Sequence, residues 1–312
     1  MSEHNEPTAD TGGPLDPAAR ADFATQAFVT HRNLLFTVAY EMLGSAADAE
    51  DVLQEAWLRW AGVDPATVRE VRAYLVRIVT RQALDRLRVL SRRRESYVGP
   101  WLPEPLLTAP DVAEDVELAE SVSMAMLLVL ETLGPTERAV FVLREVFGLE
   151  YGEIAEAVDK TPAAVRQIAH RARAHVAARR PRGVVSPAET QAVLEAFRQA
   201  LDTGDLQGLL DILAPDVVVL SDGGGVKRAL LHPVVGAEEV ARLLANGWRM
   251  THLKRSVEPV RVNGGAGLLV RLDGELDGVL AVRIEEGRVA GLYHVRNPEK
   301  LARVGRQTVV SR

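Results

Sequence analysis

The stretch that decides the fold reads Gly-Leu-Glu-Tyr-Gly-Glu-Ile-Ala-Glu-Ala-Val-Asp-Lys-Thr-Pro-Ala-Ala-Val-Arg-Gln-Ile-Ala-His-Arg-Ala-Arg and runs from Gly148 to Arg173. Its apolar residues recur at three- and four-residue spacing, which predicts two amphipathic helices. Asp159 and Lys160 form the turn between them. Thr161 suits an N-cap, and proline follows at the first helical position, where its missing N–H donor costs nothing. The segment is therefore predicted to be a helix-turn-helix.

The second of these helices projects basic and amide side chains away from its apolar stripe. A helix in this position places its N-terminal turns in the major groove of DNA. Arg there can read guanine and Gln can read adenine, whereas later Arg residues suit phosphates. The alternative is a solvated Arg-rich helix in an all-α bundle, but cap, turn, stripe and basic face all agree. The side chains predicted to contact DNA are Arg166, Gln167, His170, Arg171 and Arg173.

The charge distribution supports local contact with phosphates. The chain of 312 residues has a net charge of −6. Five Arg and no acid lie in 86–94, and six Arg with two His and no acid lie in 166–182. Eight acids and no Lys or Arg lie in 104–137. Two compact basic clusters in an acidic chain indicate two nucleic-acid contacts rather than a generally basic surface.

Composition excludes several other classes. The chain has no Cys, which rules out disulfides, thiolate metal sites and Cys nucleophiles and fits a reducing cytoplasm. No apolar run approaches the roughly 20 residues of a membrane helix. Residues 1–17 lack the basic start and apolar stretch of a signal peptide and are predicted to be a disordered lead. We expect a cytoplasmic protein that needs no cofactor and no metal.

The rest of the chain divides into four further blocks. Residues 18–95 and 116–181 are predicted to be helical, and residues 96–115 form a linker stiffened by four prolines. Residues 187–305 are predicted to be an α+β domain, with one helix over Ala188–Leu213 and β-branched runs between Gly turns. The predicted strands are Val217–Leu220, Gly267–Leu272, Val279–Ile284 and Val289–Val295.

Two helices in the first block differ in their surfaces. Asp48–Trp60 is amphipathic, with an acidic outer face edged by aromatic residues. Ser45 before it is predicted to be its N-cap. Tyr74–Arg88 follows about a dozen residues later and has a basic face rich in hydrogen-bond donors. The first helix suits docking to a protein, and the second suits binding a nucleic acid.

At this point the chain resembles the sigma-70 family of RNA polymerase sigma factors. Asp48–Trp60 is similar to regions 2.1–2.2, Tyr74–Arg88 to regions 2.3–2.4, and Gly148–Arg173 to region 4.2. The lack of other sigma regions between them resembles the extracytoplasmic-function group. The chain departs from many members of that group at two positions, where Arg81 replaces Asn and Tyr74 replaces Trp.

The resemblance implies core RNA polymerase and promoter DNA as partners. The acidic helix would dock on the β′ clamp helices, while the helix-turn-helix domain would meet the β flap and read the −35 element. The tail Arg92–Arg94 would only attract phosphates. The residues implied for polymerase docking are Asp48, Asp51, Gln54, Glu55 and Trp57. The residues implied for melting and holding the −10 strand are Arg77, Thr80, Arg81 and Arg88.

Three motifs in the linker and the last block resemble one subfamily, in which a SnoaL-like domain of the nuclear-transport-factor-2-like cone type is fused to the sigma factor. They are Trp-Leu-Pro-Glu-Pro from Trp101, Asp-Gly-Gly-Gly-Val-Lys from Asp222 and Asn-Pro-Glu-Lys-Leu from Asn297. The glycines lack P-loop spacing, so we expect no nucleotide there. The resemblance implies that this domain regulates the sigma core. The residues implied in the interdomain contact are Trp101, Leu102, Asp222, Gly223, Gly224, Gly225, Lys227, Asn297, Pro298 and Lys300.

The competing hypothesis for the last domain is catalysis or ligand sensing. SnoaL-like relatives include cyclases and isomerases that use a polar group inside the cone as acid or base. The candidates for such groups are Asp222, His252, Tyr293 and His294. No second base or carboxylate is paired with any of them in the sequence, so we expect no enzyme. A small-molecule ligand bound without turnover stays open as an alternative.

Overall fold

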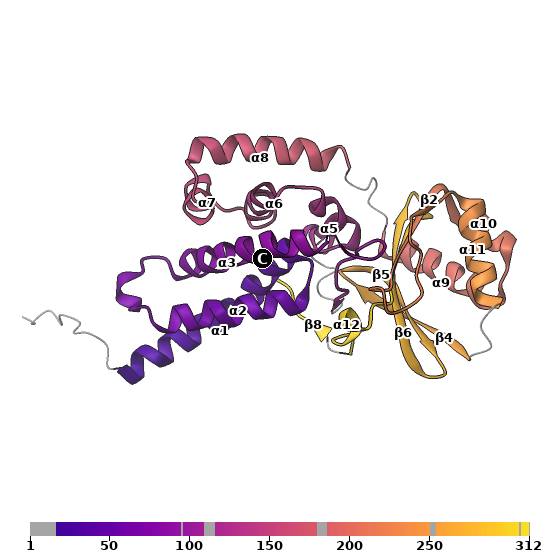
Figure 1. Cartoon of the computed structure of the whole chain (residues 1–312), viewed down its shortest axis with the longest axis horizontal. Helices are drawn as coiled ribbons and strands as arrows, with labels where there is room; N and C mark the ends of the chain where they lie inside the picture. Colours follow the sequence, from indigo (N-terminus) through magenta and orange to yellow (C-terminus); the bar gives the residue numbers. More distant parts are fainter. Residues whose placement is uncertain are drawn as a thin grey trace, which may run out of the picture.

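The computed structural model describes residues 17–94, 96–108, 116–179, 186–249, 254–305 and 307–311. In these ranges a helical part and an α+β part lie side by side (Figure 1). This confirms the predicted fold class of all-α domains followed by an α+β domain. Nearly all of the expected disordered lead, residues 1–17, falls outside the described residues, as does His252. None of the described helices is long and apolar enough to cross a bilayer.

Three long helices form the first helical unit. Gly44, with φ of 67°, ends the first helix. The Ser45 hydroxyl then accepts the backbone N–H of Asp48 at 3.2 Å, which confirms the predicted cap. The buried indole of Trp60 donates to the backbone oxygen of Ala24 at 2.9 Å and ties the second helix to the first. The helices are α1 (Pro17–Leu43), α2 (Ala46–Ala61) and α3 (Val71–Arg94), with a 3-10 turn at Pro65–Thr67.

The second helical unit packs on α3 (Figure 1). Its helix-turn-helix has the predicted form. Asp159 is left-handed with φ of 55°, and the Thr161 hydroxyl accepts the N–H of Ala164 at 3.2 Å. Both helical units share one apolar core. The helices are α4 (Val116–Ser121), α5 (Met124–Glu131), α6 (Pro135–Phe141), α7 (Tyr151–Val158) and α8 (Pro162–Ala177), with a π-helical turn at Val142–Val146.

The α+β part is one curved sheet with strand order β3-β2-β7-β6-β5-β4-β1-β8. Neighbouring strands are antiparallel except for the parallel pairs β2–β7 and β1–β8. The strands are β1 (Leu107–Thr108), β2 (Leu213–Asp222), β3 (Val234–Val235), β4 (Arg255–Val262), β5 (Gly265–Leu272), β6 (Glu275–Glu285), β7 (Arg288–Val295) and β8 (Gln307–Thr308). The helices are α9 (Pro187–Thr203), α10 (Leu206–Ile212), α11 (Ala237–Arg249) and α12 (Pro298–Leu301).

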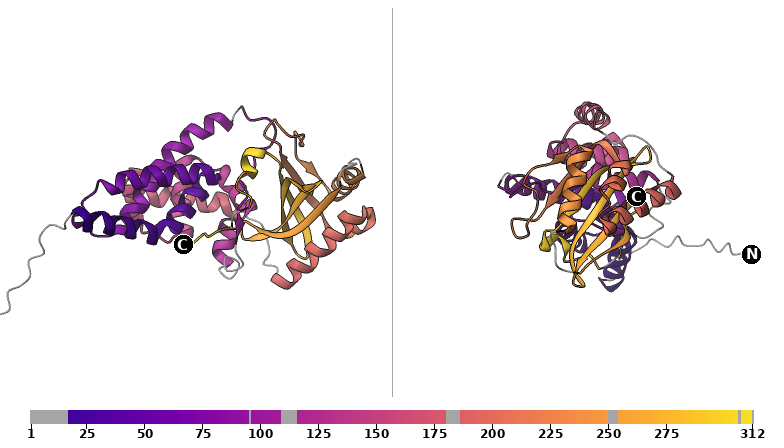
Figure 2. Two further views of the ribbon diagram at one scale, coloured as in Figure 1. Left: turned by 90° about the horizontal axis from the view of Figure 1, so that it is seen from below. Right: turned by 90° about the vertical axis from the view of Figure 1, so that its right-hand side faces the viewer.

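The two faces of the sheet have different neighbours because side chains alternate along each strand. One face packs with α9, α10 and α11 through residues such as Leu268, Leu280 and Leu292. The opposite face packs with α12, Met124 and the linker residue Leu102. Figure 2 shows α9–α11 on the far side of the sheet from the helical part. The linker and the helical part therefore cover the second face.

The linker and the C-terminal end of the described chain meet at one edge of the sheet. The linker strand β1 pairs antiparallel with β4, and β8 pairs in parallel with β1. Beyond β8, Val310 is 4% exposed and belongs to the core of the helical part. The backbone N–H of Ser311 donates to the Thr37 hydroxyl at 3.0 Å. The tail thus returns from the α+β domain to α1.

The structure corrects the outline of the last domain. The helix predicted over Ala188–Leu213 is two helices, because Gly204 adopts a left-handed φ of 66° and ends α9. Strand β4 and helix α11 were not predicted. The four predicted strands lie within β2, β5, β6 and β7.

Candidate nucleic-acid and interdomain interfaces

The recognition helix α8 presents its predicted contacts to solvent. All five of these side chains are exposed, and α8 lies on the outside of the molecule (Figure 1). Arg171 and Arg173 lie 3.7 Å from Glu137 and 3.6 Å from Glu145, which are loose pairs at exposed positions. The Arg166 guanidinium lies 6.0 Å from the ring of Tyr151. Such weak contacts leave the face open to DNA.

Part of the basic face of α3 contacts α7, while Arg81 and Arg88 remain exposed. Arg77 donates to Glu156 Oε2 at 2.7 Å, and Arg81 donates to the backbone oxygen of Glu156 at 2.7 Å. Arg77 also lies over the ring of Tyr74 at 4.9 Å. Thr80 is fully buried, so a strand could not reach it in this arrangement. The predicted −10 surface and the predicted −35 domain are therefore packed against each other.

Arg88, the fourth predicted −10 residue, behaves differently. It is exposed and pairs with Asp85 one turn earlier at 2.8 Å. Arg94 corrects the prediction that the Arg tail only attracts phosphates. Burial lowers its pKa, and it pairs with Glu131 of α5 and donates to the backbone oxygen of Leu43 at 2.7 Å. Arg94 is a structural link between the two helical units.

The acidic helix α2 offers a groove toward α1. Trp57 packs edge-on against Phe28 with ring centroids 5.4 Å apart, and Leu58 is 72% exposed. The predicted docking residues Asp51, Gln54 and Glu55 are exposed. Arg86 pairs with Asp51 and with Asp48, which is less exposed. Sequence reasoning missed Phe28 and Leu58. The groove has a volume of about 450 Å³ and is lined by Phe28, Arg32, Glu50, Leu53, Gln54, Trp57 and Leu58.

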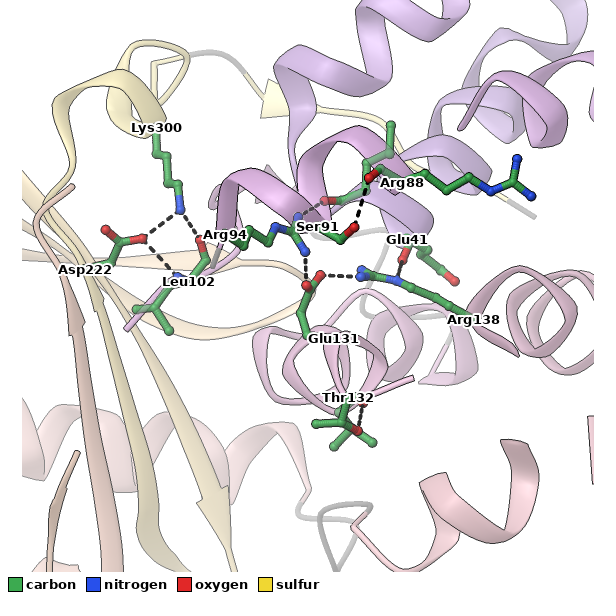
Figure 3. Close-up of polar contacts among 12 residues, drawn as sticks. Glu41, Arg88, Ser91, Arg94, Leu102, Glu131, Thr132, Arg138, Asp222 and Lys300 are labelled. Atoms are coloured by element: carbon green, nitrogen blue, oxygen red, sulfur yellow. Dashed lines mark hydrogen bonds and ion pairs between the residues drawn. The ribbon is translucent and has the colours of Figure 1, made fainter. Parts of the chain in front are cut away.

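The linker docks on the third domain through Asp222, which is 1% exposed (Figure 3). One Asp222 oxygen accepts the hydroxyl of Tyr97 at 2.6 Å. The other accepts the backbone N–H of Leu102 at 2.9 Å and Lys300 Nζ at 2.7 Å. Asn297 donates to the Tyr97 hydroxyl at 2.9 Å. Burial lowers the pKa of Lys300 to about 8, so the Asp222 carboxylate is needed to keep the ammonium charged.

The glycines next to Asp222 are required by close packing. A Cβ on Gly223 would lie 2.0 Å from the backbone oxygen of Lys227, and one on Gly224 would lie 2.4 Å from the Asn297 side chain. Gly225, with φ of 73°, packs on Val98. Asn297 caps α12, and Pro298 follows at its first position. Lys227 corrects one expectation: its ammonium pairs with Asp277 of β6 at 3.3 Å rather than with a residue of the linker.

Trp101 lies between two cations from different domains. Its ring is 3.6 Å from the guanidinium of Arg94 and 4.2 Å from Lys300 Nζ. Leu102 beside it is fully buried. The linker also contacts the first helical unit, because the backbone oxygen of Glu104 accepts the Tyr40 hydroxyl at 2.7 Å. The linker is thus held on both sides.

A buried polar cluster continues from Arg94 into the helical core (Figure 3). Glu131 pairs with both Arg94 and Arg138. Arg138, 1% exposed, donates to the backbone oxygen of Glu41 at 2.9 Å. Ser121 donates to Glu41 Oε1 at 2.8 Å. Burial raises the pKa of Glu41 to about 8, which favours a neutral carboxyl between the two helical units.

The catalytic candidates are not brought together. Tyr293 and His294 are consecutive on β7 and therefore point to opposite faces of the sheet. Burial lowers the pKa of His294 to about 4, and its Nε2 is buried against Gly278 without a hydrogen-bond partner. Asp222 is engaged by the linker. The described residues thus provide no paired acid and base for catalysis.

Comparison with known proteins defines the class. The model of Sigma-70 region 2 matches residues 27–93, and the model of Sigma-70, region 4 matches residues 123–176. These ranges contain nearly all of α3 and the helix-turn-helix, so the helical part has two regions of a sigma-70-family transcription factor.

Full-length relatives extend the match over the third domain. The chain is 35% identical to the ECF RNA polymerase sigma factor SigJ of Mycobacterium tuberculosis over 295 residues, which cover 88% of this chain and 91% of SigJ. It is 33% identical over 283 residues to the probable ECF RNA polymerase sigma factor SigI of the same species, covering 90% and 95%. The crystal structure of SigJ matches with a TM-score of 0.71 and 30% identity, covering 89% of this chain and 98% of that one. The chain belongs to the ECF RNA polymerase sigma factors, which are transcription factors rather than enzymes.

Proposed function

We propose that this chain directs transcription initiation by core RNA polymerase, with α8 reading the −35 element and α3 holding the −10 strand. The observation that carries the proposal is the placement of two basic helix faces on separate units joined by a linker. The face of α8 is exposed, and the face of α3 is partly occupied by Glu156 of the second helical unit. Arg and Gln near the N-terminus of α8 suit base edges.

The same proposal includes docking on polymerase and work in the cytoplasm beside it. The groove between α1 and α2 combines an apolar floor at Phe28 and Trp57 with acidic and amide side chains at its rim. An apolar centre with a polar rim is typical of a protein interface. We assign the groove to the β′ clamp helices and the helix-turn-helix domain to the β flap. A small-molecule ligand has no comparable support in the described contacts.

We further propose that the third domain modulates the sigma core. The contacts of Asp222 and Lys300 with the linker, and of Trp101 with Arg94, connect the third domain to the end of α3. A domain can shift the equilibrium between the promoter-bound and the unbound state only if its contacts differ between these two states. In promoter binding the two helical units have to reach separate elements, so contacts that hold them together favour the unbound state.

Run-off transcription from host genomic fragments tests the main proposal. Core polymerase alone, the chain alone and both together would be compared, with Arg166→Ala as a variant of the reading helix and Arg242→Ala on α11 as the surface control. Discrete transcripts are expected only with polymerase and chain together, and Arg166→Ala is expected to weaken them while Arg242→Ala leaves them unchanged. Transcripts that do not depend on the chain would overturn the proposal.

A further inference from the structure

The β4–β5 hairpin turn enters the helical part of the molecule. Three hairpin turns of the sheet place a residue with positive φ before a glycine. The residues at Asp273 and Glu286 are exposed, whereas Asn263, with φ of 53°, is fully buried. A Cβ on Gly264 would lie 2.7 Å from Cα of Ala119, so only glycine lets the turn approach α4 this closely.

Asn263 uses its side chain and backbone on three parts of the chain. Its Nδ2 donates to the Tyr40 hydroxyl at 2.6 Å and to the backbone oxygen of Val122 at 2.9 Å. Its Oδ1 accepts the N–H of Leu106 at 3.0 Å, and its own N–H donates to the Leu106 oxygen at 2.8 Å. Tyr40 belongs to α1, Val122 to the start of the second helical unit, and Leu106 to the linker. One third-domain residue thus joins all three.

These bonds lie where the loss of a partner has a large effect. Tyr40, Val122 and Asn263 are each fully buried, and Leu106 is 3% exposed. A buried donor or acceptor without a partner disfavours the packed arrangement, because water restores its hydrogen bond only when the interface opens. Glu41, the next residue on α1, accepts Arg138 through its backbone oxygen, so the turn sits beside a polar contact between the helical units.

We propose that the Asn263–Gly264 turn is a pin that holds the two helical units closed and thereby keeps Glu156 on Arg77 and Arg81. Asn263 is a positioning residue: it acts on the −10 surface through the placement of the second helical unit. The inference rests on the proposed −10 function of α3 for its consequence, but the closure itself is a structural statement that can be measured separately.

Energy transfer between two dyes tests the closure in the full chain. The chain has no Cys, so Val89→Cys at an exposed position of α3 and Lys160→Cys after α7 provide two sites for specific labelling. Asn263→Gly keeps the positive φ and removes the amide. We expect the open-to-closed ratio to rise about tenfold, or roughly 1.4 kcal/mol, and the transfer efficiency to fall. Glu286→Gly, the same change in an exposed turn, is the matched control and should leave the transfer unchanged.

A milder variant and a second readout keep the test decisive. If Asn263→Gly does not fold, Tyr40→Phe removes the hydroxyl that accepts the Asn263 amide and donates to Glu104, and it should likewise lower the transfer efficiency. Affinity for a randomised single-stranded DNA pool should rise several-fold in the opened variant, a gain that general destabilisation does not produce. Unchanged transfer in Asn263→Gly and Tyr40→Phe would overturn the pin. Reduced transfer without tighter DNA binding would support the pin and contradict the −10 role of α3.

Discussion

Glu156 of the helix-turn-helix domain lies on Arg77 of α3, with Oε2 2.7 Å from the guanidinium. The two residues belong to the units proposed to read the −35 and −10 elements. The Arg77 and Glu156 side chains are 33% and 67% exposed, so the pair itself stabilises the closed state only weakly. The closed state therefore depends on the buried contacts behind it.

Glu156→Gln is expected to tighten binding of single-stranded DNA modestly. The change removes a carboxylate that competes with phosphates for Arg77, and an exposed pair contributes about 0–1 kcal/mol. A two- to fivefold gain in affinity at low salt, shrinking as salt rises, is the expected result in a fluorescence anisotropy titration. Glu238→Gln, which removes a similar exposed partner of Arg242 on α11, should have no effect. An equal gain from both variants would show that only net charge matters.

The recognition helix should divide its work between base and phosphate contacts. Arg166→Ala should cost about 1–3 kcal/mol at one base position of the −35 element, because a bidentate contact to a base edge is lost. Arg173→Ala should weaken all sequences alike and reduce the salt slope by about one. Competition binding of the holoenzyme across single-base variants of a promoter measures both. Losses of equal size and no sequence dependence from both changes would contradict the division.

Substitution of Asp222 should destabilise the protein far more than substitution of Lys227. Asp222→Ala leaves Lys300 buried without its carboxylate partner and removes the acceptor of the Tyr97 hydroxyl and the Leu102 N–H. The free energy of unfolding should fall by an amount on the order of 3–5 kcal/mol. Lys227→Ala breaks a half-exposed pair with Asp277 and should cost little, about 0–1 kcal/mol. Chemical unfolding followed by circular dichroism would compare them. Asp222→Ala with near wild-type stability would mean that the linker docks elsewhere.

A double-mutant cycle tests whether the linker and Asp222 act together. Trp101 contacts Lys300, and Lys300 pairs with Asp222, so Trp101→Ala and Asp222→Ala should be non-additive in stability. Both single changes should alter promoter activity in the same direction while leaving affinity for core polymerase nearly intact. Fully additive effects would leave the third domain as an independent passenger.

Glu41 should make closure of the helical units dependent on pH. Because its folded pKa is raised to about 8, the closed protein keeps a proton that the opened or unfolded chain releases. The stabilisation of the closed state by the protonated Glu41 carboxyl is complete below the ordinary Glu pKa of about 4.3. It is lost as the pH rises to about 8. The free energy of unfolding of Glu41→Gln should be most similar to that of the wild type at low pH. Near pH 8 the variant should be the more stable of the two. A difference between the two that does not vary with pH would contradict this.

The local signals in the sequence were sufficient for the helix-turn-helix and the cap of α2. Thr161, Pro162 and Ser45 each satisfy donors within a few residues, so their roles are visible in the sequence itself. Strand β4 was missed because Glu258, Pro259 and Arg261 interrupt its apolar alternation, which reflects a strand with much of its surface exposed. Local patterns thus predicted elements whose stabilising contacts are also local.

Contacts between distant segments could not be predicted in this way. Arg94 ends a run of Arg and looks like a phosphate contact, yet Glu131 and Trp101 bury it. Asn263 stands in an ordinary Asn-Gly hairpin turn, and its partner Tyr40 is 223 residues away in the chain. Asp222 and Lys300 were both expected at the interdomain contact from the resemblance, but their direct ion pair was not predicted. Which of these residues meet depends on how three units pack.

Binding of a promoter fragment with and without core polymerase tests the central claim most directly. The account predicts that the free chain does not bind both elements specifically, because α7 holds Arg77 and Arg81 of α3, and that adding core polymerase produces specific binding at both elements. Specific, tight binding of both elements by the free chain would contradict the account.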